Sequence, residues 1–532
     1  MRAILFCFLL ATAEAQVRTS DIAAGAGQNW LTYAGTYQGS SVSSLKDITP
    51  ENVSNLAPKW TFRVPKAAGL RTRPIVYNGV MYITNTNEMY ALDARSGRVI
   101  WHYVDLKSKK KEVNRGSAIL GDKVYFVTAD IHLVALDRRT GGLVWRKQYG
   151  EIEKGMFASC APLAAETKII VGVAGGDTGM RGYVAALDAE TGEEKWRTYT
   201  VPAPGEKGSE TWGKTIDYGG GATWLSGTYD PELKTLYWPT GNPWPDFYAG
   251  DRKGDNLYTC SVIALDIETG QMKWYFQFTP GDTHDWDAQS WPMLVDLPYQ
   301  GKTRKLMLHA NRNGFLYVLD RTTGEYLRSS KLVNLLDWAS GIDPKGRPIV
   351  VPDKEPTPAG TRVCPGVQGA TNWMSQAFLP TTKWLYLATL EQCDIFTSSS
   401  KDPVPNAGFS GGGAGPKPKD RGQFFLRAYD PLTGERKWEY PMTGPGTMWG
   451  GTIGTVTGVI FTADDDGHLI AVDAKEGKHL WHYQMGEPLN ASPIIYSVDG
   501  KEYVAVAAST AIFSFGLFEP VKSIPVPVTK IQ

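Results

Sequence analysis

The chain has 532 residues, and its 55 lysines and arginines are balanced by 55 aspartates and glutamates, so its formal net charge is zero. This balance argues against nucleic acid or an anionic membrane surface as a partner, because both attract proteins with a strong positive field. The 57 glycines, 33 prolines and 18 tryptophans are typical of a turn-rich all-β protein with a large core.

The first fifteen residues have the features of a secretory signal peptide. A basic start at Arg2 is followed by an apolar run from Ala3 to Ala13, and small residues stand at positions 13 and 15. We therefore expect cleavage before Gln16 and a periplasmic mature protein, with a retained N-terminal anchor as the alternative. The chain has no Cys-x-x-Cys-His motif, so an attached c-type haem is not expected.

The pattern Asp-x-x-Thr-Gly-x-x-x-Trp, complete or slightly altered, occurs seven times. Its aspartates are Asp93, Asp137, Asp188, Asp266, Asp320, Asp430 and Asp473. They lie 44, 51, 78, 54, 110 and 43 residues apart, and the shorter spacings match a propeller blade of roughly 40–50 residues. Each copy follows two β-rich segments, so a tight turn and a last strand ending in Trp complete a four-stranded blade. The recurrent tryptophans are interpreted as packing residues.

An eighth unit is divided between the two ends of the chain. Residues 56–64 (LAPKWTFRV) contain only the final Trp strand, and residues 491–517 contain a strand pair without the motif turn. Pairing these two segments would close the ring and bury its edges. We therefore predict an all-β, eight-bladed β-propeller whose ring is closed by N- and C-terminal strands in one blade, with residues 16–532 as a single domain.

Acidic residues gather in the segment FTPGDTHDWDAQSW, residues 278–291. Asp285 and Asp287 are two positions apart and point to one side if the segment is extended. Paired carboxylates repel each other unless a cation lies between them. The segment therefore suggests a metal site or a general base, and a solvated acidic loop is the alternative.

Other polar residues stand in segments between the repeats, where propellers usually place a site over the central channel. Asp177 lies in a glycine-rich turn and Asn242 lies between prolines, and both offer hard oxygen ligands suited to Ca²⁺ or a similar cation. Arg115 and Arg312 could hold an anionic ligand or a quinone oxygen. For each arginine alone, an ion pair between blades is the other interpretation.

Together these signals resemble the pyrroloquinoline quinone (PQQ)-dependent alcohol dehydrogenases of the methanol and ethanol dehydrogenase family, across nearly all of the mature chain. The resemblance rests on the repeats and on nine landmarks in family order. They are VNRG at Val113, the Gly-x-Arg-Gly-Tyr turn ending at Tyr183, GGGATWLSGTYDPEL at Gly219, TGNP at Thr240, GDNLYT at Gly254, FQFTPGD at Phe276, NRNGFLYVLDRTTG at Asn311, NW at Asn372 and WGGT at Trp449.

The resemblance implies a role for each matching residue. Trp224 matches the tryptophan on which the flat cofactor lies, and a large π face suits a tricyclic quinone. Residues that match positions holding or lining the cofactor are Arg115, Ser159, Arg312, Asn372 and Trp449. The metal ligands match Asp177, Asn242 and Asp285, and Asp287 matches the additional aspartate of the lanthanide-dependent branch. A cation of charge +3 demands more negative charge than Ca²⁺, so calcium and a lanthanide both stay open.

The implied activity is oxidation of a primary or secondary alcohol. In this mechanism the cation acts as a Lewis acid, Asp285 takes the hydroxyl proton and a hydride passes to PQQ. Electrons then leave to an external cytochrome c or a similar carrier, and a homodimer is left open. The resemblance also implies a disulfide between Cys364 and Cys393, with Cys160 and Cys260 as thiols.

The chain departs from the family pattern at four places. The adjacent Cys-Cys that covers the cofactor is absent, and residues 108–116 (SKKKEVNRG) carry lysines there. Arg71 stands where a glutamate contacts the quinone and is a candidate partner of a PQQ carboxylate. Asp177 is one methylene shorter than the usual glutamate, and His284 replaces a tryptophan and is interpreted mainly as a structural imidazole.

These departures support a competing hypothesis. The chain would then be a non-catalytic PQQ-like propeller that acts as an extracytoplasmic scaffold or interaction protein. The joint presence of the cofactor and metal residues argues against it, because a pure scaffold needs no such polar side chains around one channel. A sugar or aldose dehydrogenase with the same cofactor is a third hypothesis.

Overall fold

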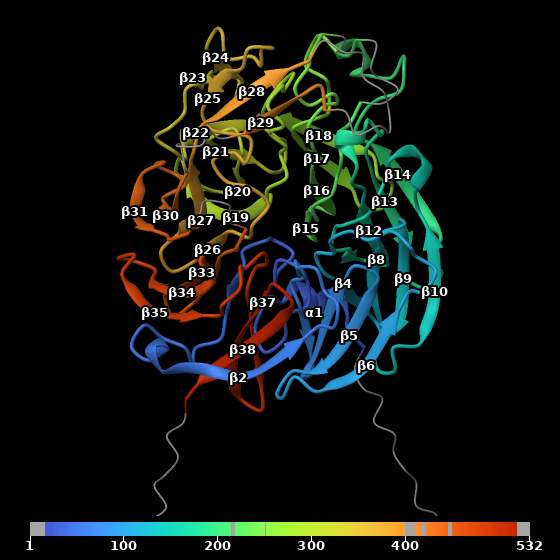
Figure 1. Ribbon diagram of the computed structural model, residues 1–532, viewed down its shortest axis with the longest axis vertical. Coiled ribbons are helices and arrows are strands. Elements are labelled where there is room, and N and C mark those ends of the chain that lie inside the picture. The colour runs from blue at the N-terminus through green and yellow to red at the C-terminus, as the bar shows by residue number, and fades with distance from the viewer. Residues whose placement is uncertain are drawn as a thin grey trace, which may run out of the picture.

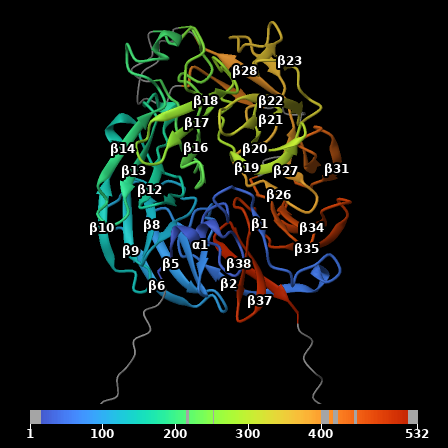
Figure 2. The same ribbon diagram turned by 180° about the vertical axis from the view of Figure 1, so that it is seen from behind.

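The computed structural model describes residues 16–213, 219–250, 252–399, 410–415, 422–444 and 449–518. The predicted signal peptide, residues 1–15, lies outside the described residues. In Figures 1 and 2 the sheets follow one another around the molecule in chain order, from blue to red, and β2 lies beside β37 and β38.

Across the described ranges, eight sheets of four or five strands hold most of the strands. The first four are β3 (Ile75–Tyr77), β4 (Val80–Asn85), β5 (Glu88–Asp93) and β6 (Val99–Val104); β7 (Ala118–Leu120), β8 (Lys123–Thr128), β9 (His132–Asp137) and β10 (Leu143–Gln148); β11 (Leu163–Ala165), β12 (Lys168–Gly172), β13 (Tyr183–Asp188) and β14 (Glu194–Tyr199); and β15 (Thr228–Asp230), β16 (Thr235–Pro239), β17 (Ser261–Asp266) and β18 (Met272–Gln277).

The next three sheets are β19 (Met293–Tyr299), β20 (Lys302–Ala310), β21 (Phe315–Asp320) and β22 (Tyr326–Lys331); β26 (Ala377–Leu379), β27 (Trp384–Glu391), β30 (Gln423–Tyr429) and β31 (Arg436–Pro441); and β1 (Val42–Ser43), β32 (Ile453–Thr455), β33 (Val459–Ala463), β34 (His468–Asp473) and β35 (His479–Gln484). The eighth joins β2 (Leu56–Arg63) to β38 (Ala511–Leu517), β37 (Lys501–Ala508) and β36 (Ile494–Val498). Strands β1 and β32 are parallel, and the other neighbours in these sheets are antiparallel wherever their pairing is given.

Two short sheets and several short helical segments lie outside the eight larger sheets. Two short sheets, β23 (Ala339–Ile342) with β24 (Pro348–Val350) and β25 (Thr361–Val363) with β28 (Asp394–Ser398) and β29 (Gly412–Gly415), lie at the top of Figure 1. The helical pieces are α1 (Thr19–Ala23) and the 3₁₀ turns η1 (Val53–Asn55), η2 (Ile152–Lys154), η3 (Gly176–Thr178) and η4 (Ser209–Thr211). None of the helices in the described ranges is long and apolar enough to cross a membrane.

The predicted pairing between the two ends of the chain is present. Strand β2 pairs with β38 in antiparallel register, from Leu56 opposite Leu517 to Arg63 opposite Ala511. The edge of the C-terminal hairpin is therefore covered by an N-terminal strand. This pairing removes an exposed sheet edge that would otherwise invite association with another chain.

The repeated motif builds a turn that receives a tryptophan from the preceding sheet. In the second sheet, Asp137 Oδ1 accepts hydrogen bonds from the backbone N–H groups of Arg139 and Thr140, at 3.0 and 2.9 Å. Gly141 then adopts φ +72°, and the indole of Trp101 lies against it. The Trp101 Nε1–H donates to the carbonyl oxygen of Arg138 at 3.0 Å. The structural interpretation of these tryptophans is confirmed, although Trp101 is the third residue of β6 and the strand does not end there.

Replacing Gly141 with alanine should lower the free energy of unfolding by about 2 kcal/mol. A Cβ at this position would lie 2.7 Å from the Trp101 ring, and its φ of +72° also disfavours a side chain. Gly121→Ala is the matched control, because Gly121 has a similar φ of +63° but nothing within 4 Å of the added Cβ. Urea unfolding of the two variants separates the clash from the backbone strain, and equal losses would contradict the docking role of Trp101.

A buried glutamate ties the N-terminal segment to the eighth sheet. Glu502, on β37, is only 3% exposed. Its Oε2 accepts from the backbone N–H groups of Asp47 and Ile48 at 2.8 and 3.2 Å, while its Oε1 has no partner among the described atoms. Burial, with a smaller contribution from the charge of Asp47, raises the pKa of Glu502 to about 7.

We expect Glu502→Gln to remove a pH dependence of stability. The pKa of Glu502 is higher in the folded state than in the unfolded state. The contribution of the protonated Glu502 to the free energy of unfolding is therefore complete at low pH, and it is lost as the pH rises from about 4.5 to about 7. Relative to the variant, the wild-type free energy of unfolding should fall by about 2 kcal/mol between pH 5 and pH 8. Urea unfolding of both proteins at the two pH values measures this difference, and a constant difference would contradict the shifted pKa.

The predicted disulfide is present. Cys364 and Cys393 are joined with an S–S distance of 2.01 Å, whereas Cys160 and Cys260 are free and buried. The bond closes a loop of 29 residues that carries Asn372 and the β26–β27 hairpin. It therefore restrains a segment that reaches the candidate site.

Candidate functional site

The predicted site residues lie in connections between strands. Asp177 is in η3, Asn242 follows β16, and Asp285 and Asp287 lie between β18 and β19. The others stand just before or after strands of other sheets, and they are Arg71, Arg115, Ser159, Trp224, Arg312, Asn372 and Trp449. Connections that lead into seven different sheets therefore contribute residues to the site, and the strands fix the positions of these connections.

Asp287 joins three of the predicted residues. Its Oδ2 accepts a hydrogen bond from Trp224 Nε1 at 3.1 Å and another from Arg312 Nη1 at 3.0 Å. Its Oδ1 accepts from the backbone N–H of Asn242 at 2.7 Å. These contacts span segments that are up to 88 residues apart in the sequence (312 − 224). The carboxylate thus fixes the position of the Trp224 indole relative to the acidic segment.

Asp285 shares the same arginine. Arg312 Nη2 lies 3.5 Å from Asp285 Oδ2, so one guanidinium faces both carboxylates. The side chain of Asp285 is 25% exposed, whereas that of Asp287 is 6% exposed. Asp285 has φ +57°, a backbone conformation that costs energy for a residue with a side chain and that is frequent at functional sites. The segment is therefore not a regular extended strand, although its two carboxylates do face one partner.

Burial raises the pKa of both carboxyl groups. The pKa of Asp285 is held well above its ordinary range by burial and by the nearby charges of Asp287, Asp177 and Asp282, against the opposing effect of Arg312. The pKa of Asp287 is raised to about 6 by burial, with Arg312 opposing and Asp177 adding to the rise. The raised pKa values reflect crowded negative charge, which a bound cation would offset.

A fourth carboxylate, Asp246, was missed by sequence reasoning. It is 3% exposed, and its Oδ1 accepts from Asn242 Nδ2 at 2.7 Å. Burial and the charges of Asp177 and Asp285 raise its pKa well above the ordinary range. Its position four residues after Asn242, in the same proline-rich turn, was the available signal. Asp246 orients the amide of Asn242 so that its carbonyl oxygen faces away from Asp246.

Asp177 lies close to this group. The residue is exposed to solvent, but the protein atoms packed around its carboxyl group raise its pKa. A hydrogen bond from Asn242 and the charge of Arg312 oppose that rise. The Oδ1 atom of Asn242 would be 3.7 Å from a Cβ placed on Gly176, which puts the amide oxygen next to the turn that carries Asp177.

The donor set fits a hard cation. The charges of Asp177 and Asp287 raise the pKa of Asp285, and the charge of Asp177 raises the pKa of Asp287. Asn242 adds a neutral oxygen, and the Arg312 guanidinium faces both Asp285 and Asp287. Oxygen-only ligands of this kind suit calcium or a lanthanide. In the ranges that the structure describes, no three acidic, histidine or cysteine side chains already surround one point, so ligation would require small side-chain rotations.

An aromatic cluster lies beside the carboxylates. Trp224 and Trp449 pack against a buried group that contains Tyr33, Trp291 and Trp373. Trp373 and Trp449 are stacked, with ring centroids 6.0 Å apart and an interplanar angle of 17°. This arrangement offers flat apolar faces at the same depth as the acidic group, which suits a planar ligand.

Arg115 connects the aromatic cluster to the polar residues. Its guanidinium carbon lies 4.6 Å from the centroid of Trp224 and 5.0 Å from that of Trp373. Its Nη1 donates to Ser159 Oγ at 2.8 Å, so two predicted cofactor residues are bonded to each other. Burial lowers the pKa of Arg115 to about 10, which still leaves it charged at neutral pH.

Three arginines in this region lack a carboxylate partner. Arg71, Arg73 and Arg115 all lie near Tyr33, and none forms an ion pair with an acidic residue in the described parts of the chain. Several buried polar atoms there also lack a hydrogen-bond partner, among them Arg115 Nε, Arg312 Nε and the Tyr33 hydroxyl. Buried groups of this kind are usually satisfied, so the region has the donors and positive charge to hold a planar polycarboxylate such as PQQ.

Two residues have mainly structural contacts. Asn372 donates from Nδ2 to the Gln368 carbonyl at 2.9 Å and accepts from the Trp373 backbone N–H at 2.8 Å. His284 stacks on Trp286 with centroids 4.4 Å apart, and its Nε2 lies 2.9 Å from the Lys354 carbonyl oxygen. The expectation that His284 is a structural imidazole agrees with these contacts.

Comparisons with known proteins agree with this geometry. A family model described as "Glucose/ethanol/alcohol dehydrogenase, beta-propeller domain" matches residues 30–329. The quinohemoprotein alcohol dehydrogenase of Comamonas testosteroni is 36% identical over 90% of this chain and 72% of its own length. The chain belongs to the family of PQQ-dependent alcohol dehydrogenases.

Further relatives carry the same description. The lanthanide-dependent methanol dehydrogenase of Methylacidiphilum fumariolicum (strain SolV) is 32% identical over 90% of this chain and 84% of its own length. The solved structure of quinohemoprotein alcohol dehydrogenase ADHIIG from Pseudomonas putida HK5 superimposes with a TM-score of 0.88 at 32% identity, covering 96% of this chain and 84% of that one. A second family model, "Outer membrane protein assembly factor BamB", matches only residues 423–514.

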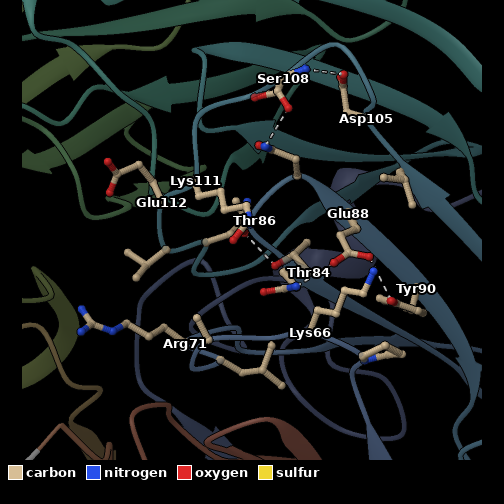
Figure 3. A pocket seen from close by; sticks show the side chains of 18 of the residues that line it. Lys66, Arg71, Thr84, Thr86, Glu88, Tyr90, Asp105, Ser108, Lys111 and Glu112 are labelled. Carbon is tan, nitrogen blue, oxygen red and sulfur yellow. Dashed lines mark hydrogen bonds between the residues drawn. The ribbon is translucent and has the colours of Figure 1, made fainter.

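A cavity lies beside the residues that depart from the family pattern. The segment that carries lysines in place of the Cys-Cys pair lines a cavity of about 990 Å³, together with Arg71 and residues of β4, β5 and β6 (Figure 3). This cavity therefore lies beside Arg71, and its lining does not include Asp285 or Asp287.

Proposed function

We propose that this protein oxidises a primary or secondary alcohol to an aldehyde or ketone, with PQQ and one Ca²⁺ or lanthanide ion, and passes the electrons to an external cytochrome c. The observation that carries the proposal is the single group formed by Asp285, Asp287, Arg312 and the Trp224 indole. A pure scaffold has no physical reason to place the buried Asp287 and the partly buried Asp285 around one arginine beside the indole of Trp224.

Each residue has a role in the proposed site. Asp177, Asn242, Asp285 and Asp287 hold the cation, and Asp246 holds the amide of Asn242. The quinone is surrounded by Trp224, Arg115, Ser159, Asn372, Trp449 and Arg71. Arg312 lies between the cation ligands and these quinone-binding residues. When bound, the quinone and the cation supply the two-electron acceptor and the Lewis acid. Asp285 accepts the proton of the alcohol hydroxyl at its carboxylate while the carbon loses a hydride and the carbonyl forms.

The finer features of the fold belong to the same proposal. We infer that the eight sheets are the blades of one eight-bladed propeller, that the shared sheet of β2 and β36–β38 closes the ring, and that residues 16–532 form a single domain. We also infer that residues 1–15 are a cleaved signal and that the enzyme works in the periplasm. The basic start and short apolar run support export.

Reconstitution tests the proposed activity. Purified protein is incubated with PQQ and either Ca²⁺ or a light lanthanide, and dye reduction is followed across a panel of primary and secondary alcohols. Alcohol-dependent dye reduction that needs both PQQ and the cation is the expected result. If the protein shows no quinone absorbance after gel filtration, the proposal is wrong and the scaffold hypothesis takes its place.

A further inference from the structure

Most residues that line the cavity in Figure 3 have no role in the proposed site. It has a volume of about 990 Å³, which lies at the upper end of the range of small-molecule sites. Its walls come from β4, β5, β6, the residues after β2 and the segment 105–114. We call it the basic cavity.

Four cations line the basic cavity without an ion pair. They are Lys66, Arg71, Lys109 and Lys111, and none of them contacts an acidic side chain within salt-bridge distance in the described residues. In Figure 3 Arg71 lies at the lower left of the lining side chains, Lys66 lies to its right, and Lys111 lies above both. Unpaired positive charge directed into a recess attracts an anion and concentrates it there.

The acidic residues of the cavity are already engaged. Glu88 accepts from Asn85 Nδ2 at 2.8 Å and lies 2.8 Å from His102 Nε2. Asp105 accepts from Arg146 Nε at 2.6 Å, outside the cavity. Glu112 has Lys110 as its neighbour at 4.0 Å. The three carboxylates therefore do not neutralise the four lining cations directly.

The rest of the wall is apolar. The apolar lining side chains include Phe62, Leu70, Val99, Val104, Leu106 and Val113. Leu106 is 87% exposed, and Val99 and Val104 are 42% and 41% exposed. Large aliphatic surfaces beside unpaired lysines match a ligand that has both a hydrocarbon body and an anionic end.

The cavity adjoins the proposed quinone site through Arg71. The Arg71 guanidinium carbon lies 5.9 Å from the centroid of Trp373, and Trp373 also contacts Arg115, which lies over Trp224. Burial lowers the pKa of Arg71, which indicates that it is partly removed from water at the inner end of the cavity. A ligand in the cavity therefore extends toward the aromatic cluster.

We propose that the basic cavity selects alcohols whose aliphatic chain ends in a carboxylate, with the carboxylate held by Lys109 and Lys111 and the hydrocarbon held against the apolar wall. This inference rests on the proposed function, since it names the substrate class of the same site. The oxidised hydroxyl lies at the opposite end of the chain from the carboxylate, so an ω-hydroxy acid is the expected form.

Three matched substrates test the inference in the reconstituted enzyme, namely 8-hydroxyoctanoate, its methyl ester and 1-octanol. We expect kcat/KM for the acid to exceed that for the ester by about tenfold, the effect of one favourable charge interaction in a partly buried site. The preference should shrink in 0.5 M salt because exposed lysines are screened. The double variant Lys109→Glu/Lys111→Glu should lose the preference for the acid over the ester, while its activity toward 1-octanol stays unchanged.

Lys107→Glu is the matched control, because Lys107 belongs to the same segment, is exposed and does not line the cavity. Equal kcat/KM values for acid and ester, or an equal loss of preference in Lys107→Glu, would overturn the inference. If the reconstituted protein oxidises neither these substrates nor any alcohol of the wider panel, the proposed function fails, and calorimetric titration with octanoate then tests the cavity alone. Octanoate binding that disappears in the double variant supports the basic cavity, and absence of binding in the wild type overturns it.

Discussion

Asp285→Asn should reduce kcat for alcohol oxidation by about 10²–10⁴-fold, the usual contribution of a positioned general base. Asparagine has the same shape but cannot accept the hydroxyl proton at neutral pH. It also tolerates the left-handed backbone better than most residues, so the φ of +57° at this position is retained. Turnover is measured at saturating PQQ and cation, so that weaker metal binding does not enter the comparison.

Asp255→Asn is a suitable control for this variant. Asp255 pairs with Arg347 at 2.5 Å on the surface, so the substitution removes a carboxylate without touching the site. Quinone absorbance and the melting temperature should be unchanged in both variants. If Asp285→Asn kept more than about a tenth of the wild-type kcat, Asp285 would not be the base.

The second large effect is expected at Asp287. Asp287→Asn should weaken binding of a trivalent lanthanide by about 100-fold, and binding of Ca²⁺ by clearly less, because the Coulomb energy lost with one negative charge grows with the charge of the cation. Asparagine keeps one oxygen for the Asn242 backbone N–H, but its amide nitrogen replaces the oxygen that accepts from Trp224 and Arg312, so the melting temperature of the variant is measured as well. Titration with Tb³⁺, followed by luminescence excited through tryptophan, measures the affinity directly in protein without PQQ.

Asp282→Asn provides the comparison for Asp287. Asp282 is buried in the same segment, but its carboxylate accepts from the backbone N–H groups of His284 and Trp286 at 3.1 and 2.8 Å and therefore braces the loop. The Asp282→Asn substitution should lower the melting temperature of the protein more than it lowers the affinity for Tb³⁺. An unchanged Tb³⁺ affinity in Asp287→Asn would remove Asp287 from the cation site and favour calcium as the natural metal.

The structure favours the enzyme hypothesis over the scaffold hypothesis. The departures that favoured the scaffold were the missing Cys-Cys pair and Arg71. In the structure both lie at the basic cavity, where lysines and Arg71 line an opening toward the aromatic cluster. The same residues that made the sequence atypical therefore have a physical use in a family of alcohol dehydrogenases.

Much of the architecture was predictable from the sequence because its determinants are local and repeated. The motif aspartate makes its hydrogen bonds within three residues, as Asp137 does with Thr140, and the motif glycine must have positive φ for the turn to close. The pairing of β2 with β38 followed from the repeat unit divided between the two ends of the chain, and the Cys364–Cys393 bond was implied by the family resemblance. The exact position of the tryptophan within its strand was not predicted, because Trp101 is followed by three further strand residues.

The amino-acid sequence by itself determined the repeat, the all-β class and the set of polar residues that match a quinone and cation site. Only the tertiary structure decided which of them meet: Arg312 between Asp285 and Asp287, Arg115 between Trp224 and Trp373, and Asp246 behind Asn242. The reason is that these contacts join loops from different sheets. Their distances depend on how the sheets pack around the centre, and local sequence carries no direct information about that packing.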